Sequence, residues 1–191
     1  MNKEQVVLGI DTSNYTTSLA MMNLNGKLIR ERRELLFVKD GMVGLRQSEA
    51  LFQHIKAIPL ISKTITDLVS SFNFVAVSSA VKPRPLEDSY MPVFVAAESF
   101  GSTISSLLDI PFYGFSHQEG HIKAGLWSLG LEFDEPFLAL HISGGTTEFL
   151  EIKHQKSGYK IKILGGTSDI SAGQFIDRIG VKMNLPFPAG V

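Results

Sequence analysis

Short apolar runs separated by polar turns open the chain. Residues 6–10 (VVLGI) have the unbroken apolar character of a buried strand, and the polar stretch at residues 11–18 (DTSNYTTS) is predicted to be a loop. Asn25 and Gly26 then mark a tight turn between two further extended runs. The beginning of the chain therefore predicts three consecutive antiparallel strands.

Helical and extended patterns alternate after these strands. Residues 47–70 carry apolar positions at helical spacing, with Pro59 as the expected kink or break. Residues 72–80 predict a strand, residues 91–109 a helix rich in small side chains, and residues 110–116 a short strand. The order β-β-β-α-β-α-β predicts an α/β fold in which helices cover a mixed sheet.

The beginning of this pattern recurs about 130 positions later. Residues 136–142 form an apolar strand, and a Ser/Gly/Thr loop, a second strand, a turn and a third strand follow. Residues 169–184 then predict an amphipathic helix with Asp169 or Ser171 as its cap. Such a duplication predicts two similar lobes with a cleft between them.

The two lobes are expected to differ in completeness. Residues 1–113 are predicted to form the first lobe, and residues 114–191 the first part of a second lobe that stops after one helix. We expect the chain to be a fragment, or to be completed by another chain.

Composition restricts the chemistry that is available. The 191 residues include no cysteine, so any metal must be held by His, Asp, Glu or Tyr. A net charge of −1 provides no basic excess for nucleic acid, which would need a local patch or a partner's help. No apolar run approaches the ~20 residues that span a bilayer, and no secretory signal opens the chain, so we expect a soluble, cytoplasmic protein without a membrane partner.

Two polar segments are candidates for phosphate binding. Residues 143–147 (SGGTT) bring several backbone N–H groups and hydroxyls to one place, and residues 11–18 are their counterpart in the first copy. Asp11, at a strand end, could orient a phosphate-bound cation. Because Gly/Ser/Thr clusters also mark ordinary hairpin turns, that alternative stays open.

Two histidines lie four residues apart in the segment FSHQEGH. On a helix, His117 and His121 would share one face with Cβ atoms ~6 Å apart, close enough to bind one ion. Glu119 would point elsewhere, so the segment is not the His-Glu-x-x-His pattern of zinc peptidases. His141, before the Ser-Gly-Gly loop, is the candidate third ligand, and His54 has the position of an ordinary helix-face residue. A surface or capping role for the pair is the alternative.

Several segments together resemble one family, the tRNA threonylcarbamoyladenosine transferases, once called O-sialoglycoprotein endopeptidases. They are VLGIDTS, FSHQEGHIKAGL, FLALHISGGTTEFLEI and LGGTSDISAGQFIDRIGVKMNLPFPAG. The resemblance covers essentially all of the chain in order. It implies the duplicated actin-like ATPase fold, which is ribonuclease H-like.

The resemblance also assigns site residues. His117 and His121 match the family's metal-binding histidines, the metal being iron or zinc, and His141 falls where some members have a metal-binding Tyr. Asp177 matches a carboxylate that holds the ribose, and Gly190 a glycine near the adenine. With the loop residues, the predicted nucleotide- or substrate-binding set comprises Asp11, His141, Ile142, Ser143, Gly144, Gly145, Thr146, Asp177 and Gly190.

The implied reaction is acyl transfer from threonylcarbamoyl-adenylate to N6 of a tRNA adenosine, with the metal as Lewis acid. The implied ligands are ATP or the adenylate, and the implied partners are tRNA and a homologous subunit bound through the first lobe. Residues 14–17 (NYTT) replace the family's usual Cys-Asp-Glu-Thr run, which suggests a divergent member. A non-catalytic nucleotide-binding paralogue that acts through partners is therefore one alternative, and a metal-dependent glycoprotein endopeptidase is another.

Overall fold

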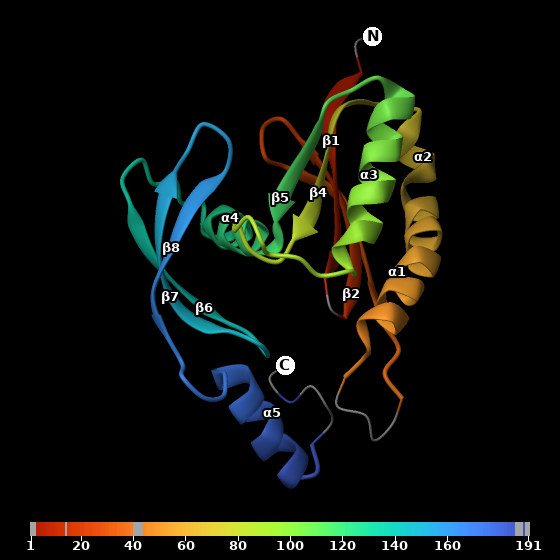
Figure 1. Cartoon of the computed structure of the whole chain (residues 1–191). Helices are drawn as coiled ribbons and strands as arrows, with labels where there is room; N and C mark the ends of the chain where they lie inside the picture. The colour runs from red at the N-terminus through yellow and green to blue at the C-terminus, as the bar shows by residue number, and fades with distance from the viewer. Residues whose placement is uncertain (1–2, 14, 40–43, 186–188, 190–191) are drawn as a thin grey trace. The chain divides into compact units, whose positions relative to one another are not determined.

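A computed structural model describes residues 3–13, 15–39, 44–185 and 189 of the chain. It contains two compact units, Met1–Trp127 and Ser128–Val191, which we call unit 1 and unit 2 (Figure 1). The elements of unit 1 are β1 (Glu4–Ser13), β2 (Thr16–Asn23), β3 (Leu28–Leu35), α1 (Gln47–Ser62), the 3-10 turn η1 (Lys63–Ile65), α2 (Thr66–Val69), β4 (Phe72–Lys82), α3 (Phe94–Leu108), β5 (Phe112–Ser116) and α4 (His117–Leu129), whose last residues pass into unit 2. The elements of unit 2 are β6 (Phe137–Ile142), β7 (Thr147–His154), β8 (Tyr159–Gly166) and α5 (Ala172–Lys182).

Unit 1 is built on a five-stranded mixed sheet with the order β3-β2-β1-β4-β5. The first three strands form an antiparallel meander, as predicted, and β4 and β5 add in parallel to the other side of β1. Parallel neighbours need a crossover, which the helices between β3 and β4 and between β4 and β5 supply. The central position of β1 gives it a partner on both edges.

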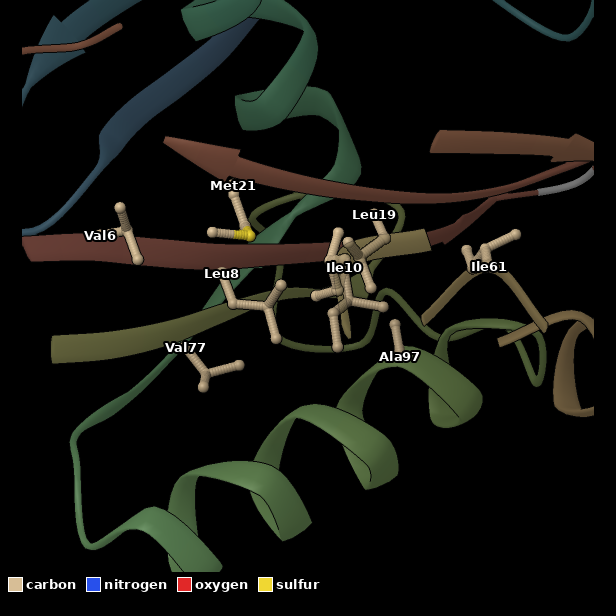
Figure 2. Close-up of a cluster of buried hydrophobic side chains, with 9 residues drawn as sticks. Val6, Leu8, Ile10, Leu19, Met21, Ile61, Val77 and Ala97 are labelled. Carbon is tan, nitrogen blue, oxygen red and sulfur yellow. The ribbon is translucent and has the colours of Figure 1, made fainter. Parts of the chain in front are cut away.

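The core of unit 1 lies between this sheet and its helices (Figure 2). Apolar side chains alternate along β1, so that every second one points into the core. The side chains that pack against those of β1 come from β2, from β4 and from the helical segments. The cluster comprises Val6, Leu8, Ile10, Leu19, Met21, Ile61, Ile65, Val77 and Ala97.

Residues 11–13 and 16–18 of the polar stretch are strand rather than the predicted loop. β1 and β2 stay paired as far as Ser13 and Thr16. Thr12 is fully buried, and its hydroxyl donates to the Val93 carbonyl at 2.8 Å while accepting from the Ala97 N–H at 3.2 Å. A strand can continue through polar residues when their buried hydroxyls form hydrogen bonds, and the polar composition alone does not indicate this.

One helix differs from the sequence pattern. The helix that was expected over residues 47–70 continues past Pro59 and ends at Ser62, where η1 and α2 follow. The compact units divide after Trp127, because β5 and most of α4 belong to unit 1, and the lobe boundary at residues 113–114 stays a prediction. The Trp127 indole N–H donates to the Gly26 carbonyl at 2.8 Å, which ties the end of α4 to the turn between β2 and β3.

Unit 2 contains a second antiparallel meander, with the strand order β6-β7-β8, followed by α5. This confirms the predicted recurrence of three strands and a helix. The Ser171 hydroxyl accepts a hydrogen bond from the Gln174 N–H at 3.2 Å and caps α5, so Ser171 rather than Asp169 is the cap. No helix in the described ranges has both the length and the apolar character needed to cross a membrane.

His54 lies on α1, as predicted, and its side chain is fully buried. Its Nδ1 lies 2.8 Å from the Thr17 hydroxyl, and its Nε2 has no hydrogen-bond partner among the described residues. Burial lowers the pKa of His54 from 6.5 to about 4, although the negative charge of Asp11 opposes this shift. The imidazole is therefore neutral in the folded chain at neutral pH.

This burial predicts acid sensitivity. Between pH 6.5 and about 4 the unfolded chain binds a proton at His54 and the folded chain does not, so stability falls as the pH drops. Chemical denaturation at a series of pH values should show a loss on the order of 2–3 kcal/mol over this range, with a much flatter profile for His54→Gln. His154→Gln, at the exposed end of β7, should keep the wild-type profile. Identical profiles for wild type and His54→Gln would contradict the assignment.

Candidate functional site

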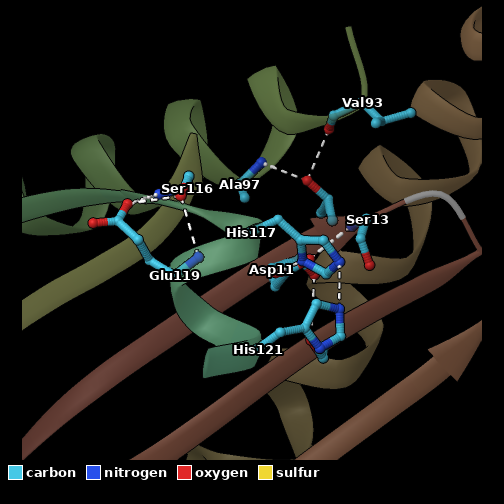
Figure 3. A network of polar contacts seen from close by, with 10 residues as sticks. Asp11, Ser13, Val93, Ala97, Ser116, His117, Glu119 and His121 are labelled. Carbon is cyan, nitrogen blue, oxygen red and sulfur yellow. Dashed lines mark hydrogen bonds and ion pairs between the residues drawn. The ribbon is translucent and has the colours of Figure 1, made fainter. Parts of the chain in front are cut away.

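The start of α4 is set by a reciprocal pair of side-chain contacts (Figure 3). The Glu119 carboxylate accepts from the Ser116 N–H at 2.8 Å and from the Ser116 hydroxyl at 2.7 Å, and that hydroxyl accepts from the Glu119 N–H at 3.2 Å. The sequence Ser-His-Gln-Glu is thus a capping box. It fixes the first helical residue at His117, and it confirms that Glu119 points away from the histidine pair.

The capping box places His117 and His121 on one face of α4, where their rings meet edge to face with centroids 4.3 Å apart. The two Nε2 atoms are 2.9 Å apart. Two nitrogen ligands that each lie ~2.1 Å from one ion can have this separation. The predicted pairing of the two histidines in space is confirmed, and the donor types suit iron or zinc.

Asp11 lies behind this pair, at the end of β1. Its Oδ2 is 2.7 Å from His117 Nδ1, and its Oδ1 accepts from the Ser13 N–H at 2.7 Å. Burial opposes the ionisation of Asp11, but the hydrogen bond and the charge attraction of His117, with the bonds from Ser13, lower its pKa below the ordinary value of 3.8. The carboxylate is therefore ionised at neutral pH and can only accept hydrogen bonds.

An ionised Asp11 determines the direction of the hydrogen bonds. His117 must donate from Nδ1, so the Nε2 of a neutral His117 carries its lone pair. In the described arrangement His121 then donates from its own Nε2 across the 2.9 Å contact. In the structure the two oxygens of Asp11 engage Ser13 and His117, and the suggested role of Asp11 toward a phosphate-bound cation stays a prediction.

The third predicted ligand, His141, lies in unit 2 on β6, opposite Glu148 of β7. No three His, Asp or Glu side chains among the described residues are grouped as a metal site. The participation of His141 in such a site stays a prediction.

The predicted Ser-Gly-Gly loop connects β6 to β7. The Ser143 N–H donates to the Thr146 carbonyl at 2.7 Å, and the Gly145 N–H donates to the Ser143 hydroxyl at 3.3 Å. Ile142 ends β6 and places the loop directly after the strand. The loop therefore has the predicted position, and its binding of phosphate stays a prediction.

The first turn of α5 lies against this loop. The Ser171 hydroxyl donates to the Gly144 carbonyl at 2.8 Å, and the Ala172 N–H donates to the Thr147 hydroxyl at 2.8 Å. Gly173 approaches so closely that an added Cβ would meet the carbonyl group of Ser143. Sequence reasoning missed this contact, although the Ser-Ala-Gly run at the helix start was a visible sign of close packing.

Asp177 lies further along α5, and its Oδ1 accepts from the Ala189 N–H at 2.8 Å. The carboxylate thus binds the backbone of Ala189, beyond the end of the helix. Gly190, predicted to lie near the adenine, is outside the described residues. The roles of Asp177 and Gly190 toward a nucleotide stay predictions.

The close approach of Gly173 predicts a cost for any side chain there. Gly173→Ala should lower the free energy of unfolding by about 1–3 kcal/mol, because the loop backbone cannot yield as a flexible side chain would. Thermal and chemical unfolding measure this effect. The control is Gly125→Ala in α4, where a Cβ meets nothing within 4 Å, so it should be neutral or slightly stabilising. Equal stability of the two variants would show that the loop and α5 do not pack as described.

Solved structures share the fold at low sequence identity. YeaZ from Pseudomonas aeruginosa matches with a TM-score of 0.51 and 13% identity over 88% of this chain and 68% of that one. The ethanolamine utilization protein EutJ from Carboxydothermus hydrogenoformans matches with a TM-score of 0.54 and 16% identity over 94% of this chain and 57% of that one. These similarities show the α/β fold of the actin-like ATPases, as predicted.

Sequence comparison identifies the family. The tRNA N6-adenosine threonylcarbamoyltransferase of Thermus thermophilus is 28% identical over 96% of this chain and 54% of its own length. The chain thus spans about half the length of the curated relatives that it matches. The model of the tRNA N6-adenosine threonylcarbamoyltransferase (TsaD) family matches residues 89–191, which is more than half of the chain. The chain therefore belongs to the tRNA N6-adenosine threonylcarbamoyltransferase family.

Proposed function

We propose that this protein binds one divalent metal and an adenine nucleotide, and acts in the transfer of threonylcarbamoyl from its adenylate to N6 of a tRNA adenosine. The observation that carries the proposal is the hydrogen-bonded series Asp11, His117, His121 in a member of this family. The proposed partners are tRNA and a homologous subunit that binds through the first lobe, in the cytoplasm.

His117 and His121 are the proposed ligands of the metal, iron or zinc, with His141 as a third donor. When bound, the ion would polarise the carbonyl of the transferred group as a Lewis acid. Asp11 would hold His117 in the tautomer that turns the Nε2 lone pair toward the ion, the role that carboxylates play behind metal-bound histidines. This position of Asp11 behind a metal ligand differs from a role in which Asp11 orients a phosphate-bound cation. The contacts of Asp11 with Ser13 and His117 support the position behind the ligand.

The loop at residues 143–146 is the proposed phosphate-binding element. Its glycines leave the backbone open to an anion, and the start of α5 beside it adds the positive end of a helix dipole. Asp177 would hold the ribose through the oxygen that does not accept from Ala189, with Gly190 near the adenine. Ile142 and Thr146 would lie at the two ends of this loop.

The alternatives rest on weaker observations. The endopeptidase would need a carboxylate directly after His117, but Gln118 stands there, and Glu119 holds the helix start. The non-catalytic paralogue is favoured only by the replaced acidic run, since Tyr15 and Thr16 stand where the family usually has Asp and Glu. Activity decides between this paralogue and the enzyme.

The proposed role of Asp11 predicts that its substitution weakens metal binding even though the ligands His117 and His121 remain. Asp11→Asn should lower the affinity for Co²⁺ or Zn²⁺ by about 10–100-fold, because His117 loses the carboxylate that sets its tautomer. Calorimetry would measure the affinity, and ¹⁵N NMR of the imidazoles would show the Nδ1–H tautomer of His117 in wild type and a mixture in the variant.

The matched control is Glu119→Gln, which keeps the capping geometry and removes a carboxylate that the histidine pair does not use. It should bind metal with wild-type affinity, whereas the double variant His117→Ala, His121→Ala should lose binding. Wild-type affinity and an unchanged His117 tautomer in Asp11→Asn would exclude Asp11 as a positioning residue.

The transferase proposal predicts product formation. The chain, supplied with threonylcarbamoyl-adenylate, metal and an acceptor tRNA, should form threonylcarbamoyladenosine, measured by mass spectrometry of digested tRNA. The variant His117→Ala, His121→Ala should abolish the product. Asp177→Ala should weaken ATP binding by about tenfold, as the loss of a hydrogen bond to a charged group implies, and exposed Asp169→Ala should not. Tight ATP binding without any product would instead favour the non-catalytic paralogue.

A further inference from the structure

The connection between β4 and α3 lies beside the start of α4 (Figure 1). Lys82, the last residue of β4, is the register partner of Ser116 on the parallel strand β5, and neighbouring strands lie about 5 Å apart. The Pro83 carbonyl accepts from the Gln118 N–H at 3.0 Å. Because His117 stands between Ser116 and Gln118 in the sequence, Lys82 is next to the proposed metal ligands.

This connection is closed by its own hydrogen bonds. The Lys82 ammonium donates to the Leu86 carbonyl at 3.1 Å, and the Arg84 N–H donates to the Ser89 hydroxyl at 3.0 Å. Arg84 has a proline on either side. A proline has a fixed φ and restricts the residue before it to extended conformations. A segment that is constrained in this way loses little conformational freedom when a ligand binds.

Charges of opposite sign are separated along the connection. Lys82 and Arg84 are half-buried at its beginning, whereas Glu87 and Asp88 are exposed further along. The exposed carboxylates would repel the phosphates of an RNA that approached from solvent. The connection therefore suits a small anion beside the metal ligands better than it suits RNA.

The Lys82 ammonium has donors left for a ligand. An ammonium carries three N–H donors, and the Leu86 carbonyl is its one acceptor among the described residues. No carboxylate in the described part of the chain forms an ion pair with Lys82. Two donors and an uncompensated positive charge are thus available next to His117.

The proposed substrate carries an anion at a matching distance. The threonylcarbamoyl group has a free carboxylate, whose carbon is three bonds and at most about 4 Å from the carbonyl carbon that the metal would polarise. The flexible four-carbon stem of Lys82 can bring its ammonium to such a position from the strand beside Ser116.

We propose that Lys82 binds the carboxylate of the threonylcarbamoyl group and so selects an acyl group that carries this charge. The inference rests on the proposed function for the identity of the substrate. Lys82 forms and breaks no covalent bond in this role. It determines the affinity for the acyl group and its orientation at the metal ligands.

Two stable analogues test the proposal by binding alone. N-carbamoyl-threonine keeps the carboxylate, and its carboxamide lacks the charge. NMR titration of the whole chain, with and without Zn²⁺, should show about tenfold or more tighter binding of the acid, as a hydrogen bond to a charged group implies. Lys82→Met should remove this preference, and Lys82→Arg should retain most of it. The matched control Lys63→Met removes an exposed lysine in η1 and should behave as wild type.

Kinetics provide a second readout. Lys82→Met should raise the KM for threonylcarbamoyl-adenylate by about 10–100-fold, while kcat, the KM for tRNA and the affinity for Zn²⁺ stay near their wild-type values. A raised KM for tRNA alone would identify an RNA contact, and a lower affinity for Zn²⁺ would identify a support for the metal ligands. Either result overturns the proposal.

The binding test also separates this proposal from the proposed function. Equal binding of the acid and the carboxamide to wild type, or binding of neither, overturns the role of Lys82 even when the chain forms product. If wild type forms no product, the proposed function fails, and a preference for the acid that Lys82→Met removes still supports the carboxylate site.

Discussion

The pairing of β1 on both edges is the constraint on which the rest of unit 1 depends. An antiparallel neighbour on one side and a parallel one on the other hold the strand in register along its length. Because every second side chain of β1 is buried, a shift by one residue would turn the core outward. Asp11 therefore has a fixed place at the end of the strand, and His117, 106 positions away in the sequence, meets it there.

Two carboxylates near the histidine pair have different tasks. Glu119 binds the backbone and hydroxyl of Ser116 and so decides where α4 begins, which in turn decides that His117 and His121 share a face. Asp11 binds an imidazole nitrogen and so decides which nitrogen of His117 keeps a lone pair. One acts on geometry and the other on protonation. The resemblance of FSHQEGH to a peptidase motif is therefore superficial, because neither carboxylate is placed to activate a water molecule beside both histidines.

Local patterns predicted most of the elements, and long-range contacts account for what they missed. The apolar runs and the Asn-Gly turn identified the meander, since periodicity and turn chemistry are local properties. Residues 11–13 and 16–18 were predicted to be a loop, and the burial of His54 was not predicted, because the partners of Thr12 and Thr17 lie 81 and 37 positions away. The approach of Gly173 to Ser143 is equally non-local. The Ser116 capping box, by contrast, is encoded by four consecutive residues, and it would have placed the histidine pair on α4 from the sequence alone.

The duplication separates two kinds of information in a sequence. An alternation of apolar and polar residues states that one face of a strand will be buried, but it does not state what will bury it. β1 and β6 make this plain, because similar patterns lead to a closed core in unit 1 and to an exposed apolar pair, Leu140 and Phe149, in unit 2. The covering elements come from other segments, such as β4 and α3. The patterns of these segments do not indicate which strand they will cover. A repeated unit supplies this information, since the arrangement in one copy indicates which edge and which face of the other copy need a partner.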